Sequence, residues 1–335
     1  MAVRGPVVTV EEAGGSPPST AVEPGSDPIM TSDQTIGIYG QGLFGSDTPT
    51  QNRKYLGQLQ TSAFNLMMLF TLHVDAHFDL AWSSTPIASN GAITNEWTGM
   101  QEPKLPDLVR GLRQGGFDTI LFSVGSADVS DWHNIQTALE GTADDWDHLQ
   151  KNFRAVADWL QIDGFDIDCE EPDILPRTIA AAAAMLAPLG AKNIITCAPY
   201  GDQTSLDWWL SCMEVIVNRN GRQLVDWWNV QDYGWAAADP RQWLAGVEKQ
   251  QDAIGVKDPA AFIRPGFAAT GADGDRPGRT PRQMQDVLDG LVDLQLTGSF
   301  VWNARTILDA VSPPAPAPRA YAEALRNGLD GRPGR

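Results

Sequence analysis

The segment Ile162–Pro172, IDGFDIDCEEP, combines the apolar character of a buried strand with five acidic residues. Moving a charged group out of water costs free energy unless that group is paired or neutralised. Side chains alternate between the two faces of a strand, so residues 164–170 would present two different faces. These faces are Asp166, Asp168 and Glu170 (the acidic row) on one side, and Phe165, Ile167 and Cys169 on the other. The segment therefore predicts a strand with an apolar face under helices and an acidic face toward a cavity.

Seven further segments have the length and the apolar, β-branched or aromatic composition of buried strands. They span residues 35–40, 64–72, 118–125, 193–200, 225–233, 262–269 and 298–304. Helical patterns separate them, as in 239–255, which starts with Asp239 and Pro240 and ends at Gly255. This alternation predicts one α/β domain, a single (β/α)8 TIM barrel, with its active site at the C-terminal ends of the strands.

The chain is expected to divide into three parts. Residues 1–33 are rich in proline, serine and acids and are predicted to be disordered. Residues 34–328 would form the barrel, and residues 329–335 a flexible tail. The first thirty residues lack the continuous apolar core of a secretory signal, so the chain as written is expected to be cytoplasmic, or secreted if its N-terminus is truncated or non-native.

Composition narrows the range of partners and chemistry. The 335 residues carry a net charge of −18, which argues against nucleic acid or an anionic membrane surface as a partner. No run is long and apolar enough to span a bilayer. The three cysteines, Cys169, Cys197 and Cys212, lie in apolar surroundings and are expected to be free thiols.

The segment DGFDIDCE (163–170) matches the Asp-x-x-Asp-x-Asp-x-Glu signature of glycoside hydrolase family 18, which contains chitinases and endo-β-N-acetylglucosaminidases. Four other segments resemble elements of that family in the expected order along the barrel. They are FSVGS (122–126), with Ser126 in place of a second glycine, CAPY (197–200), VQDYG (230–234) and FVWN (300–303). The resemblance covers residues 34–325, nearly all of the predicted barrel.

The resemblance implies a retaining mechanism in which the substrate supplies the nucleophile. Glu170 would protonate the glycosidic oxygen, and the substrate's 2-acetamido oxygen would attack the anomeric carbon. Asp168 would orient the acetamide, with Asp166 sharing a proton with Asp168, and Tyr233 would hydrogen-bond the acetamide oxygen. Asp163 falls outside the inward face and is expected to be structural.

Substrate contacts are expected from Trp302 beneath the sugar, from Gln231 and from Ser123. Aromatic side chains near strand ends offer further flat faces for pyranose rings. The candidates are Tyr39, Trp82, Trp97, Trp132, Tyr200 and Trp235, of which two or three are expected to matter. Residues 270–297 hold little beyond one helix, so no sizeable insertion domain is predicted. The cleft should therefore be open, which favours cleavage within the polymer (endo action).

Two short sequence patterns resemble a nucleotide-binding site and a metal-binding site. GQGLFG (40–45) follows a strand like a dinucleotide fingerprint, but the loop SDTPTQ comes next instead of a helix, so no nucleotide cofactor is predicted. The acids and histidines of HVDAHFD (73–79) alternate and would share one face of an extended segment, as metal ligands can. No other His or Cys cluster supports a metal, and a polar loop beside the cleft is the preferred interpretation.

The sequence thus predicts a chitinase-like glycosidase for β-1,4-linked N-acetylglucosamine, with N-acetylglucosamine-containing oligo- or polysaccharide as its partner and no cofactor or metal. Three alternatives stay open: cleavage of the chitobiose core of N-glycans, a biosynthetic enzyme that reuses the acid-lined barrel, and a non-catalytic carbohydrate-binding relative.

Overall fold

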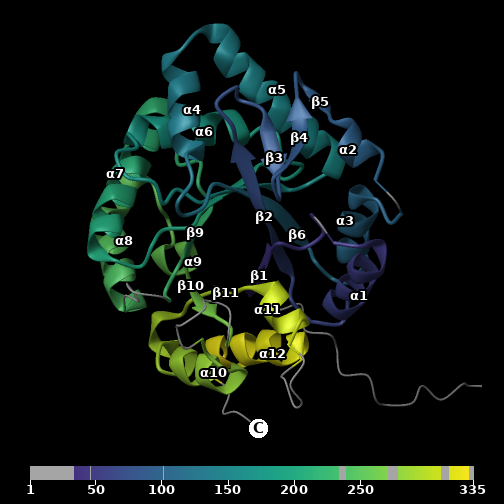
Figure 1. The fold of residues 1–335 in the computed structure, drawn as a ribbon. Coiled ribbons are helices and arrows are strands. Elements are labelled where there is room, and N and C mark those ends of the chain that lie inside the picture. Colours follow the sequence, from purple (N-terminus) through teal and green to yellow (C-terminus); the bar gives the residue numbers. More distant parts are fainter. Residues whose placement is uncertain are drawn as a thin grey trace, which may run out of the picture. The chain divides into compact units, whose positions relative to one another are not determined.

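Eight parallel strands close into a barrel in the computed structural model, which describes residues 34–45, 47–100, 102–233, 239–270, 278–310 and 317–331 (Figure 1). The barrel strands are β1 (Thr35–Gln41), β2 (Leu66–Val74), β6 (Thr119–Val124), β7 (Gly164–Ile167), β8 (Ile194–Cys197), β9 (Trp227–Val230), β10 (Ile263–Ala268) and β11 (Gly298–Trp302). Strand β1 pairs with both β2 and β11, which closes the sheet. All eight predicted strands are present, with ends that differ by a few residues. The predictions for residues 1–33 and 332–335 lie outside the described residues.

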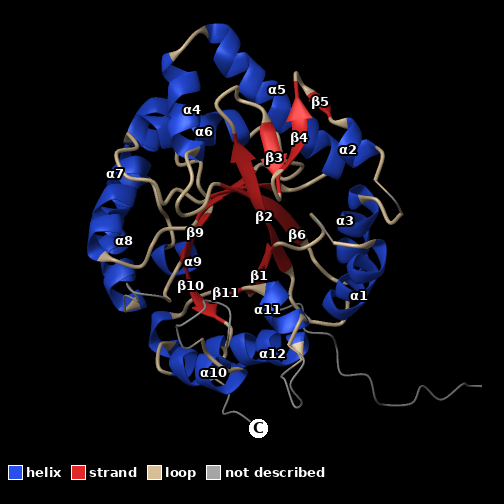
Figure 2. Ribbon diagram, in the orientation of Figure 1, coloured by secondary structure: helices blue, strands red, loops and turns tan. Residues whose placement is uncertain are grey.

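Helices surround the barrel (Figure 2). They are α1 (Pro49–Leu59), α2 (Asn95–Thr98), α3 (Leu105–Gln114), α4 (Asp131–Glu140), α5 (Ala143–Leu160), α6 (Pro176–Leu186), α7 (Gln203–Asn220), α8 (Pro240–Ile254), α9 (Pro259–Phe262), α10 (Pro281–Asp289), the 3₁₀ turn η2 (Val292–Leu294), α11 (Ala304–Leu308) and α12 (Pro318–Leu329). The predicted caps of α8 are found: Asp239 accepts the backbone N–H of Arg241, and Gly255 ends the helix with φ 66°. None of the described helices has the length and apolar character needed to cross a bilayer.

The barrel strands separate two apolar cores. The larger core joins the outward strand faces to the helices and contains Phe165, Ile167 and Cys169. The smaller core fills the barrel interior and consists of Tyr39, Leu66, Met68, Phe70, Leu121, Ala198, Trp227 and Phe300. The alternation predicted for 164–170 is therefore confirmed on its apolar side. All three cysteines are free and buried, as predicted.

An antiparallel extension of β2 is the main element that sequence reasoning missed. Strand β2 continues to Val74, and the chain returns through β3 (Leu80–Trp82), β4 (Thr85–Ser89) and β5 (Ala92–Ile93). The polar residues of 73–79 point to separate partners: His73 contacts Asp131, while Asp79 contacts His148. Within the described ranges, no group of three His, Cys, Asp or Glu side chains is placed to hold a metal ion.

Gly164 permits the close approach of β7 to β8. A Cβ atom at Gly164 would lie 1.8 Å from the carbonyl oxygen of Ile194. We expect Gly164→Ala to lower the free energy of unfolding by about 1–3 kcal/mol, because the backbone of one strand must shift. Gly57 is the matched control: it lies in α1 with nothing within 4 Å of an added Cβ, so Gly57→Ala should raise stability by about 0.5–1 kcal/mol. Urea unfolding measures both, and equal stabilities of the two variants would contradict this account of β7.

Candidate active site

A cavity of about 270 Å³ opens at the C-terminal ends of the barrel strands. It is lined by Tyr39, Gln41, Phe70, Ser126, Ala127, Asp168, Glu170, Ala198, Tyr200, Gln231, Tyr233 and Trp302. Aromatic side chains and two carboxylates therefore face one another across it.

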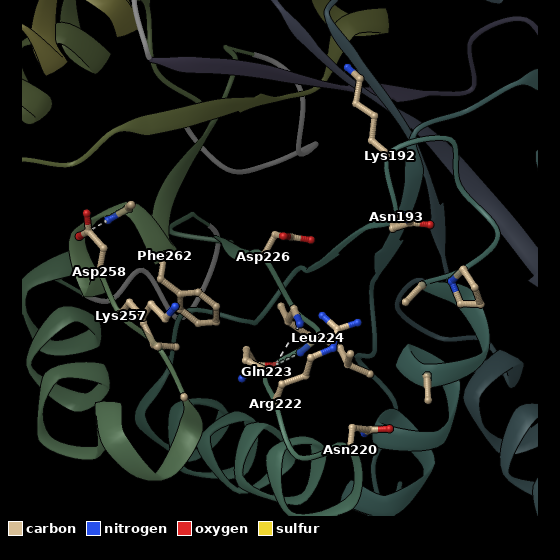
Figure 3. A pocket seen from close by; sticks show the side chains of 17 residues that line it. Lys192, Asn193, Asn220, Arg222, Gln223, Leu224, Asp226, Lys257, Asp258 and Phe262 are labelled. Atoms are coloured by element: carbon tan, nitrogen blue, oxygen red, sulfur yellow. Dashed lines mark hydrogen bonds between the residues drawn. The ribbon is translucent and has the colours of Figure 1, made fainter.

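A larger hollow of about 910 Å³ lies at the opposite end, among the loops that precede β8, β9 and β10 (Figure 3). Its Gln223 and Asp258 side chains are bonded to backbone N–H groups of their own loops, and it contains no member of the acidic row. Two members of the acidic row, Asp168 and Glu170, line the smaller cavity instead, which makes it the candidate active site.

Asp166 is fully buried below the cavity floor and accepts four hydrogen bonds. The donors are Tyr39 Oη at 2.8 Å, Ser123 Oγ at 2.9 Å, Thr196 Oγ1 at 2.5 Å and Asn229 Nδ2 at 3.1 Å. Ser123 is itself fully buried and does not line the cavity, so its predicted contact with substrate is wrong: it supports Asp166 instead. Thr196 and Asn229 were missed, although each lies on the inward face of its strand, Asn229 two residues before Gln231.

Asp168 and Glu170 form a hydrogen-bonded pair at the cavity wall. The Gln231 side-chain amide donates to Asp168 Oδ1 at 3.2 Å and to Glu170 Oε1 at 3.0 Å, and it also contacts the Ala198 carbonyl at 3.0 Å. The expected pairing of Asp168 with Asp166 is therefore not the one observed. The four donors around Asp166 saturate that carboxylate, and Asp168 turns to Glu170.

Solved structures of family 18 glycoside hydrolases share this architecture. A family 18 chitinase from Pseudoalteromonas aurantia superposes with a TM-score of 0.62 at 16% identity, over 88% of this chain and 100% of that one. A fungal family 18 endo-β-N-acetylglucosaminidase gives 0.59 at 17% identity, over 88% and 98%. The chitinase ChiC from Aspergillus fumigatus gives 0.58 at 17% identity, over 88% and 99%. The chain has the fold of glycoside hydrolase family 18.

No family model and no curated protein matches the sequence. The chain thus shares the family 18 fold with these structures at low sequence identity. The match covers 88% of this chain and leaves no large additional domain, as predicted.

The protonation of the acidic row follows from its surroundings. Burial raises the pKa of Asp168 well above its usual range, and the nearby charges of Glu170 and Asp166 raise it further. Burial also raises the pKa of Asp166, but the hydrogen bonds from Thr196, Tyr39, Ser123 and Asn229 oppose that effect. Of the two aspartates, Asp168 is therefore the one whose surroundings favour the protonated carboxyl more strongly.

Aromatic rings surround the acidic pair. Trp302 lies half-buried at the end of β11, with its ring 6.5 Å from that of Tyr233 and nearly parallel to it, at 15°. Phe70 meets Trp302 edge-on at 4.9 Å, and Tyr39 lies 5.7 Å from Trp302. Together with Tyr200, these rings line the cavity of the family 18 fold. Phe70 was missed because it follows a run of four other apolar residues in β2, and nothing in that run marks it as facing the cavity.

Three of the six aromatic candidates, Trp82, Trp97 and Trp132, do not line the cavity. Trp82 and Trp97 are buried and stack on each other at 5.2 Å behind β2, and the buried Trp132 donates its indole N–H to the Asp168 carbonyl. Trp82 instead donates to the Phe70 carbonyl and so supports the cavity wall from behind. Trp235 lies outside the described residues.

Asp232 is a buried acid that faces away from the cavity, between Gln231 and Tyr233. Its Oδ1 has no hydrogen-bond partner among the described residues, and burial raises its pKa from 3.8 to about 7. Between about pH 4 and 7 the folded state therefore keeps a proton on Asp232 that the unfolded state releases. The stability that depends on this proton is fully present below about pH 4 and is lost as the pH rises to about 7.

Asp232→Asn should remove that pH dependence. A shift of about three pKa units corresponds to roughly 4 kcal/mol, so the unfolding free energy of the variant, relative to the unaltered protein, should rise by up to that amount between pH 4 and 7. Urea titrations at several pH values measure the difference. Stability curves that stay parallel over this range would show that Asp232 does not titrate as described.

Proposed function

We propose that the chain is a retaining, substrate-assisted glycoside hydrolase that cleaves β-1,4-linked N-acetylglucosamine. The observation that carries the proposal is the hydrogen-bonded pair of Asp168 and Glu170 in an aromatic-lined cavity at the C-terminal ends of the barrel strands. The family 18 fold supports it, because the solved structures that share this fold include chitinases.

The pair supplies the acid for the first step. The proton that Asp168 holds passes to Glu170, which donates it to the glycosidic oxygen as the bond from that oxygen to the anomeric carbon breaks. Asp168 is then an anion that accepts the acetamide N–H of the substrate. The acetamide oxygen attacks the anomeric carbon and forms a cyclic oxazolinium ion, and the Asp168 charge stabilises this cation.

Water completes the reaction. A water molecule gives a proton to the Glu170 carboxylate, and its oxygen attacks the anomeric carbon from the side the leaving group left. The bond from that carbon to the acetamide oxygen breaks at the same time, which opens the oxazolinium ring and restores the acetamide. Tyr233 would hydrogen-bond the acetamide oxygen, and Trp302 would lie beneath the sugar ring. Gln231 would keep the two carboxylates in register, and Tyr39 and Tyr200 would contact the sugar at the cavity wall.

The cavity favours cleavage within a chain. About 270 Å³ lies below the range of about 300–1,000 Å³ typical of pockets that enclose drug-sized ligands. An open site of this size would hold the sugar at the reacting bond and leave the rest of the polymer outside, which suits endo action.

The chitobiose core of N-glycans is the second candidate substrate. It contains the same linkage and the same 2-acetamido group, and a fungal endo-β-N-acetylglucosaminidase shares the fold with a TM-score of 0.59. Incubation with chitin oligosaccharides and, separately, with a high-mannose glycopeptide, with products analysed by mass, tests both. We expect shorter N-acetylglucosamine oligomers from the first. Release from the glycopeptide alone would favour the second candidate, and release from neither would favour a binding protein or a biosynthetic enzyme.

A further inference from the structure

Glu171, the neighbour of the proposed acid, does not line the cavity but binds the first turn of α4. Its side chain is only 2% exposed. Its Oε1 accepts the backbone N–H of Trp132 at 2.8 Å, and its Oε2 accepts the backbone N–H of His133 at 3.0 Å. The same Oε2 lies 2.5 Å from His133 Nδ1.

This carboxylate replaces the local cap of α4. The first N–H groups of a helix have no partner within the helix and carry partial positive charge, which a nearby carboxylate stabilises. Ser130 is the N-cap residue of α4, and its side chain makes no capping hydrogen bond. The helix is therefore capped by Glu171, which lies about forty positions further along the chain.

A second hydrogen bond connects α4 to the backbone on the N-terminal side of Glu170. The indole N–H of Trp132 donates to the Asp168 carbonyl at 2.9 Å, and the Asp168 N–H donates to the Val124 carbonyl at 2.9 Å. Gly125 makes room for this contact: it has φ +97°, and a Cβ atom there would lie 2.2 Å from the Asp168 oxygen and 2.3 Å from Trp132 Nε1. The residues two before and one after Glu170 are thus both held by α4 and its neighbours.

The helix itself is fastened to β2, beside which it lies (Figure 1). Asp131 accepts the Val74 N–H at 2.7 Å and pairs with His73 at 2.9 Å, and Asn134 donates to the Val74 carbonyl at 2.8 Å. The first turn of α4 is therefore fixed to β2. Through this turn, the backbone on both sides of Glu170 is held in place relative to the barrel.

We infer that Glu171 is a positioning residue for Glu170, acting through the first turn of α4. The inference rests on the proposed hydrolase function, because it assigns Glu171 to the placement of the proposed acid. Glu171 touches neither the substrate nor the reacting atoms. Displacement of a catalytic group by about 1 Å can cost on the order of 10²-fold in rate, so loosening residue 171 should lower turnover more than binding.

Kinetics of Glu171→Ala test this placement. On N-acetylglucosamine oligomers we expect kcat to fall by about 10–100-fold while KM stays within about threefold. Glu171→Gln should recover much of the loss, because its amide oxygen can still accept the Trp132 N–H. Glu140→Ala is the matched control, since Glu140 ends the same helix in an exposed pair with Arg177 and should leave kcat unchanged. A kcat within twofold of the unaltered protein in Glu171→Ala would overturn the inference.

Hydrogen exchange gives a readout that does not depend on activity. The Trp132 and His133 amides and the Trp132 indole proton should exchange faster in Glu171→Ala than in Glu140→Ala, and so should the Asp168 amide. If the unaltered protein cleaves no N-acetylglucosamine oligomer, the proposed function fails, and the exchange result still decides whether Glu171 holds the segment. Unchanged exchange at Trp132 and Asp168 would overturn the inference in either case.

Discussion

Glu170→Gln should lower the rate of N-acetylglucosamine oligomer hydrolysis by about 10²–10⁴-fold, the usual contribution of general acid catalysis. The amide keeps the shape of the side chain and a contact with Gln231 but has no proton to give to the leaving oxygen. Substrate binding should persist, because the aromatic walls are untouched. Steady-state kinetics give the rate, and calorimetric titration with the oligomer gives the affinity. Full activity in this variant would remove Glu170 from the mechanism.

Asp168→Asn should lower kcat by about 10²–10³-fold, on the scale of losing one preorganised electrostatic contact to the transition state. Asparagine cannot pass a proton to Glu170 and carries no charge to stabilise the oxazolinium cation. The loss should appear in kcat and in kcat/KM, because the contact is made mainly in the transition state.

Asp163→Asn is the matched control for this loss. Asp163 belongs to the same signature but accepts hydrogen bonds from Arg113 and from the Ile120 N–H, away from the cavity. It should lower stability more than turnover. Equal losses of kcat in the Asp163 and Asp168 variants would mean that both act through the fold, and the role proposed for Asp168 would be withdrawn.

The barrel was predictable because its strands are local features of the sequence. Each is a short apolar run between turns, and their regular alternation with helices leaves few alternatives to a closed parallel sheet. The extension β3 to β5 was not predictable in the same way. Its strands are short and half-exposed, and its pairing with β2 depends on a partner that periodicity does not reveal.

The acidic row was predictable from period-two alternation, but its internal pairing was not. Asp166 and Asp168 are neighbours on one face, yet Asp166 is surrounded by donors from β1, β6, β8 and β9, which lie far apart in sequence. The same limit explains Trp82, Trp97 and Trp132. Each lies near a strand end in the sequence, and only the packing of α4 and of the β2 extension shows that their rings are covered.

The central claim is that the substrate's own 2-acetamido group is the nucleophile beside Asp168 and Glu170. The most direct test compares β-1,4-linked hexamers of N-acetylglucosamine and of glucose, incubated with the unaltered protein and analysed by mass. The account predicts internal cleavage of the N-acetylglucosamine hexamer and an intact glucose hexamer, because only the first carries the nucleophile. Equal cleavage of both hexamers, or cleavage of neither, would contradict it.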